Sequence, residues 1–106
     1  MFYKKDDTQY KTQLDGVHFK TLVHGNHTSL HEFRLDKGSE IPMHSHPHEQ
    51  TGYLVSGRMN FKFRDRTIPV EPGDSWNIPG GEEHGVAVIE NCVVIEIFSP
   101  VREEYL

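Results

Sequence analysis

The chain has almost no cysteine and no long apolar run. Cys92 is the only cysteine among 106 residues, so no intrachain disulfide can form and nothing favours an oxidising compartment. Because Cys92 begins the apolar run 92–95, we expect a buried thiol rather than a nucleophile. No window approaches the length of a membrane span, and no apolar stretch follows Met1. We therefore expect a cytoplasmic protein without a membrane partner.

Positive charge is also scarce. Eleven Lys and Arg residues stand against sixteen Asp and Glu residues, which gives a formal net charge of -5. One basic run, made of Arg58, Lys62, Arg64 and Arg66, alternates with Met59, Phe61 and Phe63. That alternation is typical of a strand with a solvent face and a core face, so we expect the three apolar side chains to face the core. Nucleic acid is not expected as a partner.

Helical periodicity is absent, whereas short β-type runs bounded by Gly, Pro, Asn or Asp recur along the chain. We expect strands at 17–23 and 28–35, joined through Gly25-Asn26, and at 53–55 and 59–64, joined by a turn at Ser56-Gly57. Further strands are expected at 68–70, at 75–78, and at 85–89 and 92–98 with a turn at Glu90-Asn91. About eight antiparallel strands in a chain of this length predict one all-β domain over residues 1–106, a sandwich or a closed barrel.

Several histidines lie in segments with the spacing of metal ligands. His44 and His46 are two apart, so on an extended strand both imidazoles face one side, and His84 follows a Gly-rich turn. Gln50 can complete the set, while Glu49 is a minor candidate because it points to the opposite face of a regular strand. His48 shares the parity of His44, but Pro47 disturbs the strand, which places His48 around the site or at its mouth. From the residues alone, an exposed polar stretch without a ligand remains an alternative.

The complete spacing is more specific. Five residues separate Gly38 from His44, one separates His44 from His46, three separate His46 from Gln50, and six separate Gln50 from Gly57. The second segment runs from Gly73 through Pro79 and Gly81 to His84, with five, one and two residues between them. These segments, about 38–57 and 73–88, resemble the two motifs of the cupin superfamily, with Gln50 where most cupins carry glutamate and Val88 where asparagine is common.

The cupin resemblance implies a double-stranded β-helix, or jelly-roll barrel. It also implies one divalent transition metal ion (Zn, Ni, Mn or Fe) held by His44, His46, Gln50 and His84. Small cupins commonly dimerise, so we expect a homodimer, to which the apolar start Met1-Phe2-Tyr3 can add a strand.

Within the superfamily, residues 44–50 and the ending 98–106 resemble KdgF-type cupins, which open 4,5-unsaturated uronates to linear keto forms during pectin and alginate breakdown. This resemblance implies a sugar-acid substrate and a site completed by Glu96, Phe98 and Arg102, with glutamate where the family more often has aspartate. Arg102 would hold the carboxylate, Phe98 would pack on the sugar ring and Glu96 would move a proton.

Glu96 is unusual independently of any family, because it interrupts the apolar run 93–98. A carboxylate in such a strand should have a raised pKa unless a cation lies nearby, which suits a general acid or base. Two other functions remain open at this level: a cupin that binds a metal or small ligand without catalysis, and a metal-dependent oxygenase or isomerase that acts on another small molecule.

Overall fold

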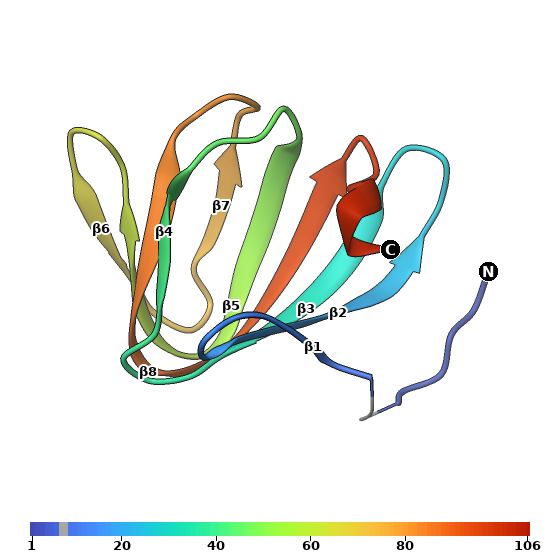
Figure 1. Cartoon of the computed structure of the whole chain (residues 1–106), viewed down its shortest axis with the longest axis horizontal. Helices are drawn as coiled ribbons and strands as arrows, with labels where there is room; N and C mark the ends of the chain where they lie inside the picture. The colour runs from blue at the N-terminus through green and yellow to red at the C-terminus, as the bar shows by residue number, and fades with distance from the viewer. Residues whose placement is uncertain (7–8) are drawn as a thin grey trace.

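The computed structural model describes residues 1–6 and 9–106, and within them the chain is almost entirely β-structure (Figure 1). Eight strands and one short 3-10 helix are found in this described part. The strands are β1 (Lys11–Leu14), β2 (Val17–His24), β3 (Ser29–Leu35), β4 (Glu40–His44), β5 (Glu49–Lys62), β6 (Thr67–Val70), β7 (Ser75–Ile78) and β8 (His84–Ser99), and the helix is η1 (Glu103–Tyr105). The all-β prediction is confirmed.

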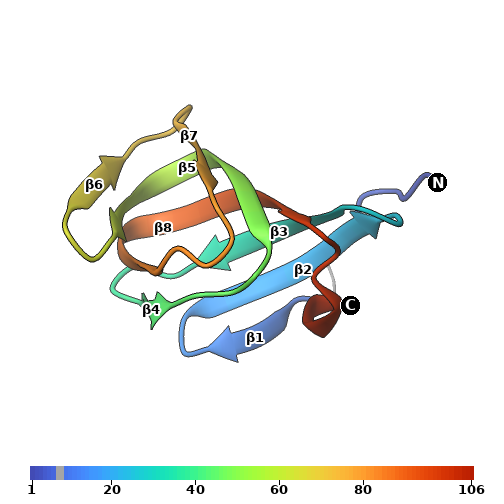
Figure 2. The ribbon, with the colours of Figure 1, turned by 90° about the horizontal axis from the view of Figure 1, so that it is seen from above.

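Two long strands, β5 and β8, pair with each other in antiparallel register and organise the molecule. The first part of β5 also pairs with β7 and its last part with β6, while the first part of β8 pairs with β4 and its last part with β3. Strands β2 and β1 extend the sheet beyond β3. Seen from above, the strands curve round into a barrel, and this is the jelly roll that the sequence predicts (Figure 2).

Two predicted turns are wrong. The chain does not reverse at Ser56-Gly57 or at Glu90-Asn91, because β5 and β8 run through these positions without interruption. The pairing register of β5 with β8 shifts three times between Leu54 and Met59, and Gly57 has a φ of 93°. A positive φ and an irregular register produce a bulge that bends a strand without ending it, so the turn-like residues mark the bend of the barrel.

The predicted core face is correct. Met59 and Phe61 are 2% and 3% exposed, and Phe63 packs partly buried against the same core. The basic residues of that region lie on the outside, where Arg58 pairs with Glu71 at 3.3 Å and Lys62 with Glu40 at 3.9 Å. Cys92 is buried, as expected, and burial raises the pKa of its thiol.

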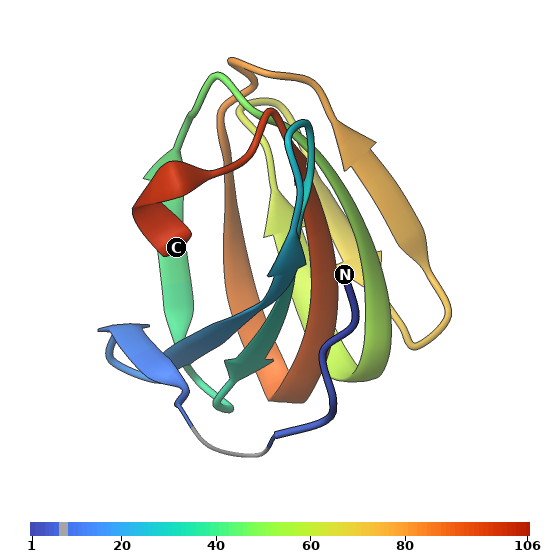
Figure 3. The same cartoon turned by 90° about the vertical axis from the view of Figure 1, so that its right-hand side faces the viewer.

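The N-terminal segment lies outside the barrel, whereas the C-terminal segment packs onto its core through Tyr105 (Figure 3). The C-terminal residues after β8 turn back as η1, which lies beside β2 and β3, and the N-terminal segment runs along the outer side of the molecule (Figure 3). Met1, Phe2 and Tyr3 are exposed and belong to no strand in this structure, so the strand that they were expected to add to a neighbour remains a prediction. Among the described residues, no helix has the length and apolar character needed to cross a membrane.

Candidate metal centre and active site

Three histidines meet at one end of the barrel. His44 ends β4 and His84 begins β8, and the two residues are register partners across the β4–β8 pair. His46 follows in the connection to β5, and one ligand nitrogen from each of the three rings lies within 4.8 Å of the others. His46 and His84 are 8% and 2% exposed. The structure therefore brings together the three histidines that the sequence selected.

The hydrogen bonds of these rings fix which nitrogen faces inward. The Nδ1 atoms of His44, His46 and His84 lie 2.9, 3.0 and 2.8 Å from the carbonyl oxygens of Pro42, His48 and Glu82. A carbonyl oxygen only accepts, so each Nδ1 donates its proton. Burial lowers the pKa of His46 to about 4 and lowers that of His84, so both rings stay neutral and keep a lone pair on Nε2. This is how proteins orient histidines toward a metal.

Gln50, the second residue of β5, touches both this cluster and an acid. Its Oε1 lies 3.0 Å from His46 Nε2, and its Nε2 donates to Glu96 Oε1 at 2.9 Å. Because His46 Nδ1 already carries the ring proton, two lone pairs face each other across that 3.0 Å contact. A cation placed between them resolves this conflict, and oxygen with imidazole nitrogen is a donor set that divalent transition metals accept. The residues present fit a metal ion.

Glu96 lies inside the barrel wall, 5% exposed, in a row of cross-strand neighbours. Gly52 is the register partner of Glu96 on one side and of Trp76 on the other. A Cβ at position 52 would overlap Trp76 Nε1 and lie 2.5 Å from Glu96 Oε2, so only glycine leaves space for the indole to approach the acid. Burial raises the pKa of Glu96 to about 8, against the opposing effects of its hydrogen bonds to Gln50 and Trp76 and of Arg102. The raised pKa predicted from the sequence is confirmed.

Arg102 comes from the segment after β8 and is 8% exposed. Its guanidinium carbon lies 4.8 Å from the centre of the Phe98 ring and 4.2 Å from that of Tyr105, so the two rings hold it by cation–π contact. Arg102 Nε is buried and makes no hydrogen bond with any residue in the described ranges. It forms an ion pair with the exposed Glu104 at 3.5 Å.

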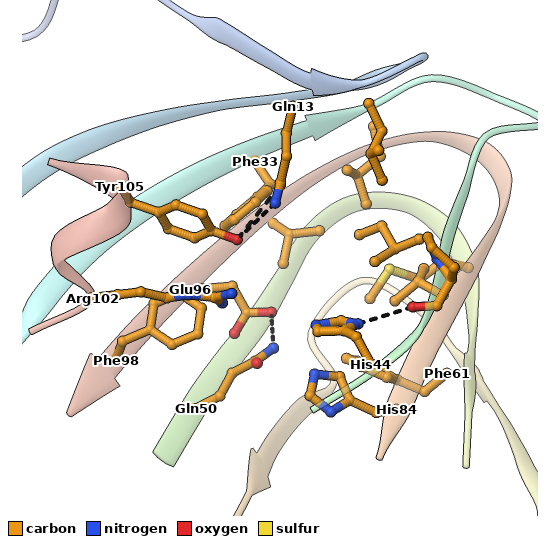
Figure 4. A pocket seen from close by; sticks show the side chains of 17 residues that line it. Gln13, Phe33, His44, Gln50, Phe61, His84, Glu96, Phe98, Arg102 and Tyr105 are labelled. Carbon is orange, nitrogen blue, oxygen red and sulfur yellow. Dashed lines mark hydrogen bonds between the residues drawn. The ribbon is translucent and has the colours of Figure 1, made fainter. Parts of the chain in front are cut away.

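The residues of the site surround one cavity of about 260 Å³. In Figure 4, His44 and His84 lie on one side, Arg102, Phe98 and Tyr105 lie on the other, and Glu96 with Gln50 lies between the two groups. Gln13 reaches in from β1 to the Tyr105 hydroxyl, with its Nε2 at 3.3 Å. The remaining lining is largely apolar and includes Phe33, Leu35, Met59, Phe61, Val86 and Val94. A cavity of this kind suits a small ligand that carries a negative charge at one end.

The remaining residues considered from the sequence, Glu49, His48 and Val88, lie outside the histidine cluster. Glu49 is exposed and accepts a hydrogen bond from Asn77 at 2.8 Å, so it faces outward as the strand parity predicts. His48 stacks edge-on to Phe98 and lies 3.9 Å from Glu104, beside the cluster and outside it. Val88, at the departure from the second motif, is a core residue.

Sequence reasoning missed four residues in or behind the site. Gln13 and Tyr105 line the cavity, Trp76 contacts Glu96, and His31 packs behind Phe98 and Tyr105. Tyr105 stands three residues after Arg102, a spacing that would place both on one side of a short helix, and this was the one available signal. The other three reach the site only through strand register, which the sequence does not reveal.

The barrel and its histidine cluster define a cupin. The family model described as a cupin domain matches residues 31–98, and the chain belongs to this family.

More particularly, the chain is similar to pectin degradation protein KdgF of Dickeya dadantii (strain 3937), with 25% identity over 99% of this chain and 97% of that protein. The structure of KdgF from a Halomonas species matches with a TM-score of 0.92 and 27% identity, covering all of both chains. An RmlC-like cupin from Shewanella frigidimarina NCIMB 400 matches with a TM-score of 0.91 and 26% identity, over 99% of this chain and 95% of that one.

Proposed function

We propose that this protein is a metal-dependent enzyme that opens the ring of 4,5-unsaturated uronates to give linear keto acids, in the breakdown of pectin or alginate. Its similarity to two KdgF proteins supports a role in that chemistry. The observation that carries the proposal is the charge of the cavity. Arg102 is buried in the wall, whereas Glu96, the buried acid, is held protonated at neutral pH. The only ion pair of Arg102 within the described residues is with the exposed Glu104, so no buried carboxylate balances its charge inside the cavity, and an anionic sugar acid would do so.

His44, His46, His84 and Gln50 are the residues that would hold one divalent transition metal ion (Zn, Ni, Mn or Fe). Such an ion supplies Lewis acidity that polarises an oxygen atom of the sugar. None of these four side chains carries a negative charge, so they leave the charge of the ion uncompensated. This adds to the preference of the cavity for an anion.

Arg102 binds the carboxylate of the sugar acid, and the cation–π contacts with Phe98 and Tyr105 keep its planar fork in place. The ring opening is redox-neutral: a proton leaves the anomeric hydroxyl, the bond between C1 and the ring oxygen breaks, and a proton is added at C4 as the enol becomes a ketone. Glu96 has a pKa of about 8, so both of its protonation states are accessible near neutral pH. It can therefore both accept and donate the proton.

The direct test follows the ultraviolet absorbance of the conjugated alkene in an unsaturated uronate. Metal-loaded protein should accelerate its loss, and Glu96→Gln should lower kcat by at least about a hundredfold, the usual effect of removing a general acid or base. Metal content should stay unchanged, because Glu96 touches Gln50 and not the histidines. A decay rate that metal-loaded protein leaves unchanged would refute the proposed function.

Glu49→Gln is the matched control, because Glu49 faces solvent and does not line the cavity. It should turn over substrate as the unmodified protein does. Binding of a uronate without turnover would favour a ligand-binding cupin, and oxygen uptake by iron-loaded protein would favour an oxygenase. The homodimer and the cytoplasmic location stay predictions.

A further inference from the structure

A buried histidine outside the metal cluster has no part in the chemistry above. His31 lies on β3, is fully buried, and is the register partner of Glu96 on β8. Its ring nitrogens contact two hydroxyl groups, Thr21 Oγ1 at 3.1 Å and Ser29 Oγ at 2.7 Å. Both hydroxyl groups also contact the segment that carries Arg102.

The direction of each hydrogen bond in this group can be assigned. Thr21 Oγ1 lies 2.6 Å from the carbonyl oxygen of Tyr105, which only accepts, so the Thr21 hydroxyl donates there. Thr21 Oγ1 must then accept from His31 Nδ1. Burial and the nearby charge of Arg102 lower the pKa of His31 to about 4, so the ring is neutral and its Nε2 accepts from the Ser29 hydroxyl. Ser29 Oγ in turn accepts the backbone N–H of Arg102 at 3.2 Å.

The chain of bonds is thus continuous and leaves none of its members unsatisfied. It starts at the backbone N–H of Arg102, passes through Ser29, His31 and Thr21, and ends at the carbonyl of Tyr105. It spans the whole turn that contains η1 and attaches both of its ends to β2 and β3.

We propose that Thr21, His31 and Ser29 are positioning residues that hold the C-terminal segment 99–105 against the barrel, and so place Arg102 to receive the substrate carboxylate. This inference rests on the proposed function for its substrate. A terminal segment with a three-residue helix has few contacts of its own and would ordinarily fray. The edge-on contacts of the His31 ring with Phe98 and Tyr105, at 5.3 and 5.4 Å between centroids, add the two rings that contact the Arg102 guanidinium to the same unit.

The test compares Thr21→Val, which keeps the shape and removes the hydroxyl, with Thr21→Ser, which keeps the hydroxyl and removes a methyl group. Thr21→Val and Ser29→Ala should raise KM for the unsaturated uronate about tenfold with a smaller change in kcat, since each removes a hydrogen bond that places Arg102. Thr21→Ser should retain a KM within about twofold of the unmodified protein. If Thr21 acted only through its packing, Thr21→Ser would raise KM more than Thr21→Val, because Thr21→Val preserves the packing and Thr21→Ser removes a methyl group.

Amide hydrogen exchange, measured by NMR on metal-loaded protein, provides a readout that does not need catalysis. Thr21→Val and Ser29→Ala should accelerate exchange of the Arg102 amide by at least about tenfold, and Thr21→Ser should not. Thr12→Val is the matched control, because Thr12 Oγ1 lies 2.9 Å from His18 Nδ1 in an exposed Thr–His pair that does not touch the C-terminal segment.

The two readouts separate the possible failures. If the unmodified protein does not turn over uronates, the proposed function is wrong, and the exchange measurement alone decides whether the segment is held as proposed. If Thr21→Val and Ser29→Ala lower Tm but leave both KM and Arg102 exchange unchanged, the positioning role is wrong. The same conclusion follows if Thr12→Val accelerates Arg102 exchange as much as Thr21→Val does.

Discussion

Gln50 departs from the usual cupin pattern, and its neighbour Glu96 supplies the reason. Its amide nitrogen donates to Glu96 Oε1 while its amide oxygen faces His46. A glutamate at position 50 would place two carboxyl groups within hydrogen-bond distance, and the two could not both ionise. An amide offers an oxygen to the metal site and an N–H to the acid at the same time. The sequence showed the departure, but only the contact with Glu96 explains it.

Gly52 is the second residue whose identity depends on Glu96. Gly52→Ala should displace Trp76 or Glu96, because the added Cβ would overlap the indole nitrogen and approach Glu96 Oε2 to 2.5 Å. We expect kcat/KM for the uronate to fall by about a hundredfold, the loss that a displacement of about 1 Å can cause. Metal content should not change, since position 52 touches none of the histidines.

Gly25→Ala is the control for this measurement, because a Cβ at Gly25 meets nothing within 4 Å. Its kcat/KM should match that of the unmodified protein. Full activity of Gly52→Ala would show that the row formed by Trp76, Gly52 and Glu96 does not set the position of the acid.

Among the strands, the sequence predicted which segments are extended better than it predicted where each strand ends. The range 75–78 is correct, as is the pairing of β2 with β3. Residues 56–57 and 90–91 have the composition of turns, yet they lie inside β5 and β8. Local composition cannot distinguish a bend from a reversal, because both need a positive φ or an unpaired residue and only long-range pairing decides between them.

The same limit applies to the site. His44, His46 and His84 are recognisable because their spacing within two motifs is local, and Glu96 because it interrupts an apolar run. His31 and Trp76 join the site through cross-strand register with Glu96 and Gly52, which has no local signature.

Gly57 tests how the bend in β5 is made. Gly57 has a φ of 93°, and a Cβ there would overlap Asn91 O and lie 2.7 Å from Cys92 Cα. Gly57→Ala should therefore lower the free energy of unfolding by about 2–4 kcal/mol, the sum of a strained φ and a backbone clash. Urea denaturation followed by circular dichroism measures this change.

Gly38→Ala separates the two causes, because Gly38 has a similar φ of 84° with nothing within 4 Å of its added Cβ. It should cost only about 1–2 kcal/mol, the strain of a left-handed residue without the clash. Equal losses for Gly57→Ala and Gly38→Ala would mean that β8 moves away without cost, so the close contact between the two long strands would not be what fixes the bend.

For the whole molecule, a metal ion that binds only the folded state should raise its stability. At a free Zn²⁺ or Ni²⁺ concentration a hundred times the Kd, the expected gain is about 2.7 kcal/mol, visible as a higher Tm in calorimetry. His44→Ala should abolish most of this gain. His24→Ala should retain it, because His24 at the exposed end of β2 lies outside the cluster of three. A gain that persists in His44→Ala would place the metal elsewhere.

The pH dependence of stability in metal-free protein reports on the buried groups together. His31 and His46 have pKa values of about 4 in the folded state against 6.5 as free groups, and the pKa of His84 is lowered too. Between about pH 4 and 6.5 the unfolded chain binds more protons than the folded one, so the free energy of unfolding rises with pH. Glu96 acts in the opposite direction: its pKa of about 8 in the folded state, against 4.5, makes stability fall as pH rises toward 8.

Three histidines outweigh one glutamate below about pH 6.5. Between about pH 6.5 and 8 the difference comes mainly from Glu96, because the raised pKa values of Cys92 and Tyr105 start from ordinary values of 9.0 and 10.0. Urea denaturation of chelator-treated protein should therefore give a maximum of stability near pH 6.5. Glu96→Gln should remove the decline between about pH 6.5 and 8 and preserve the rise below it. If the free energy of unfolding of Glu96→Gln still fell with the same slope in this pH range, Glu96 would ionise as readily in the folded protein as in the unfolded chain. The cavity would then lack its protonated acid.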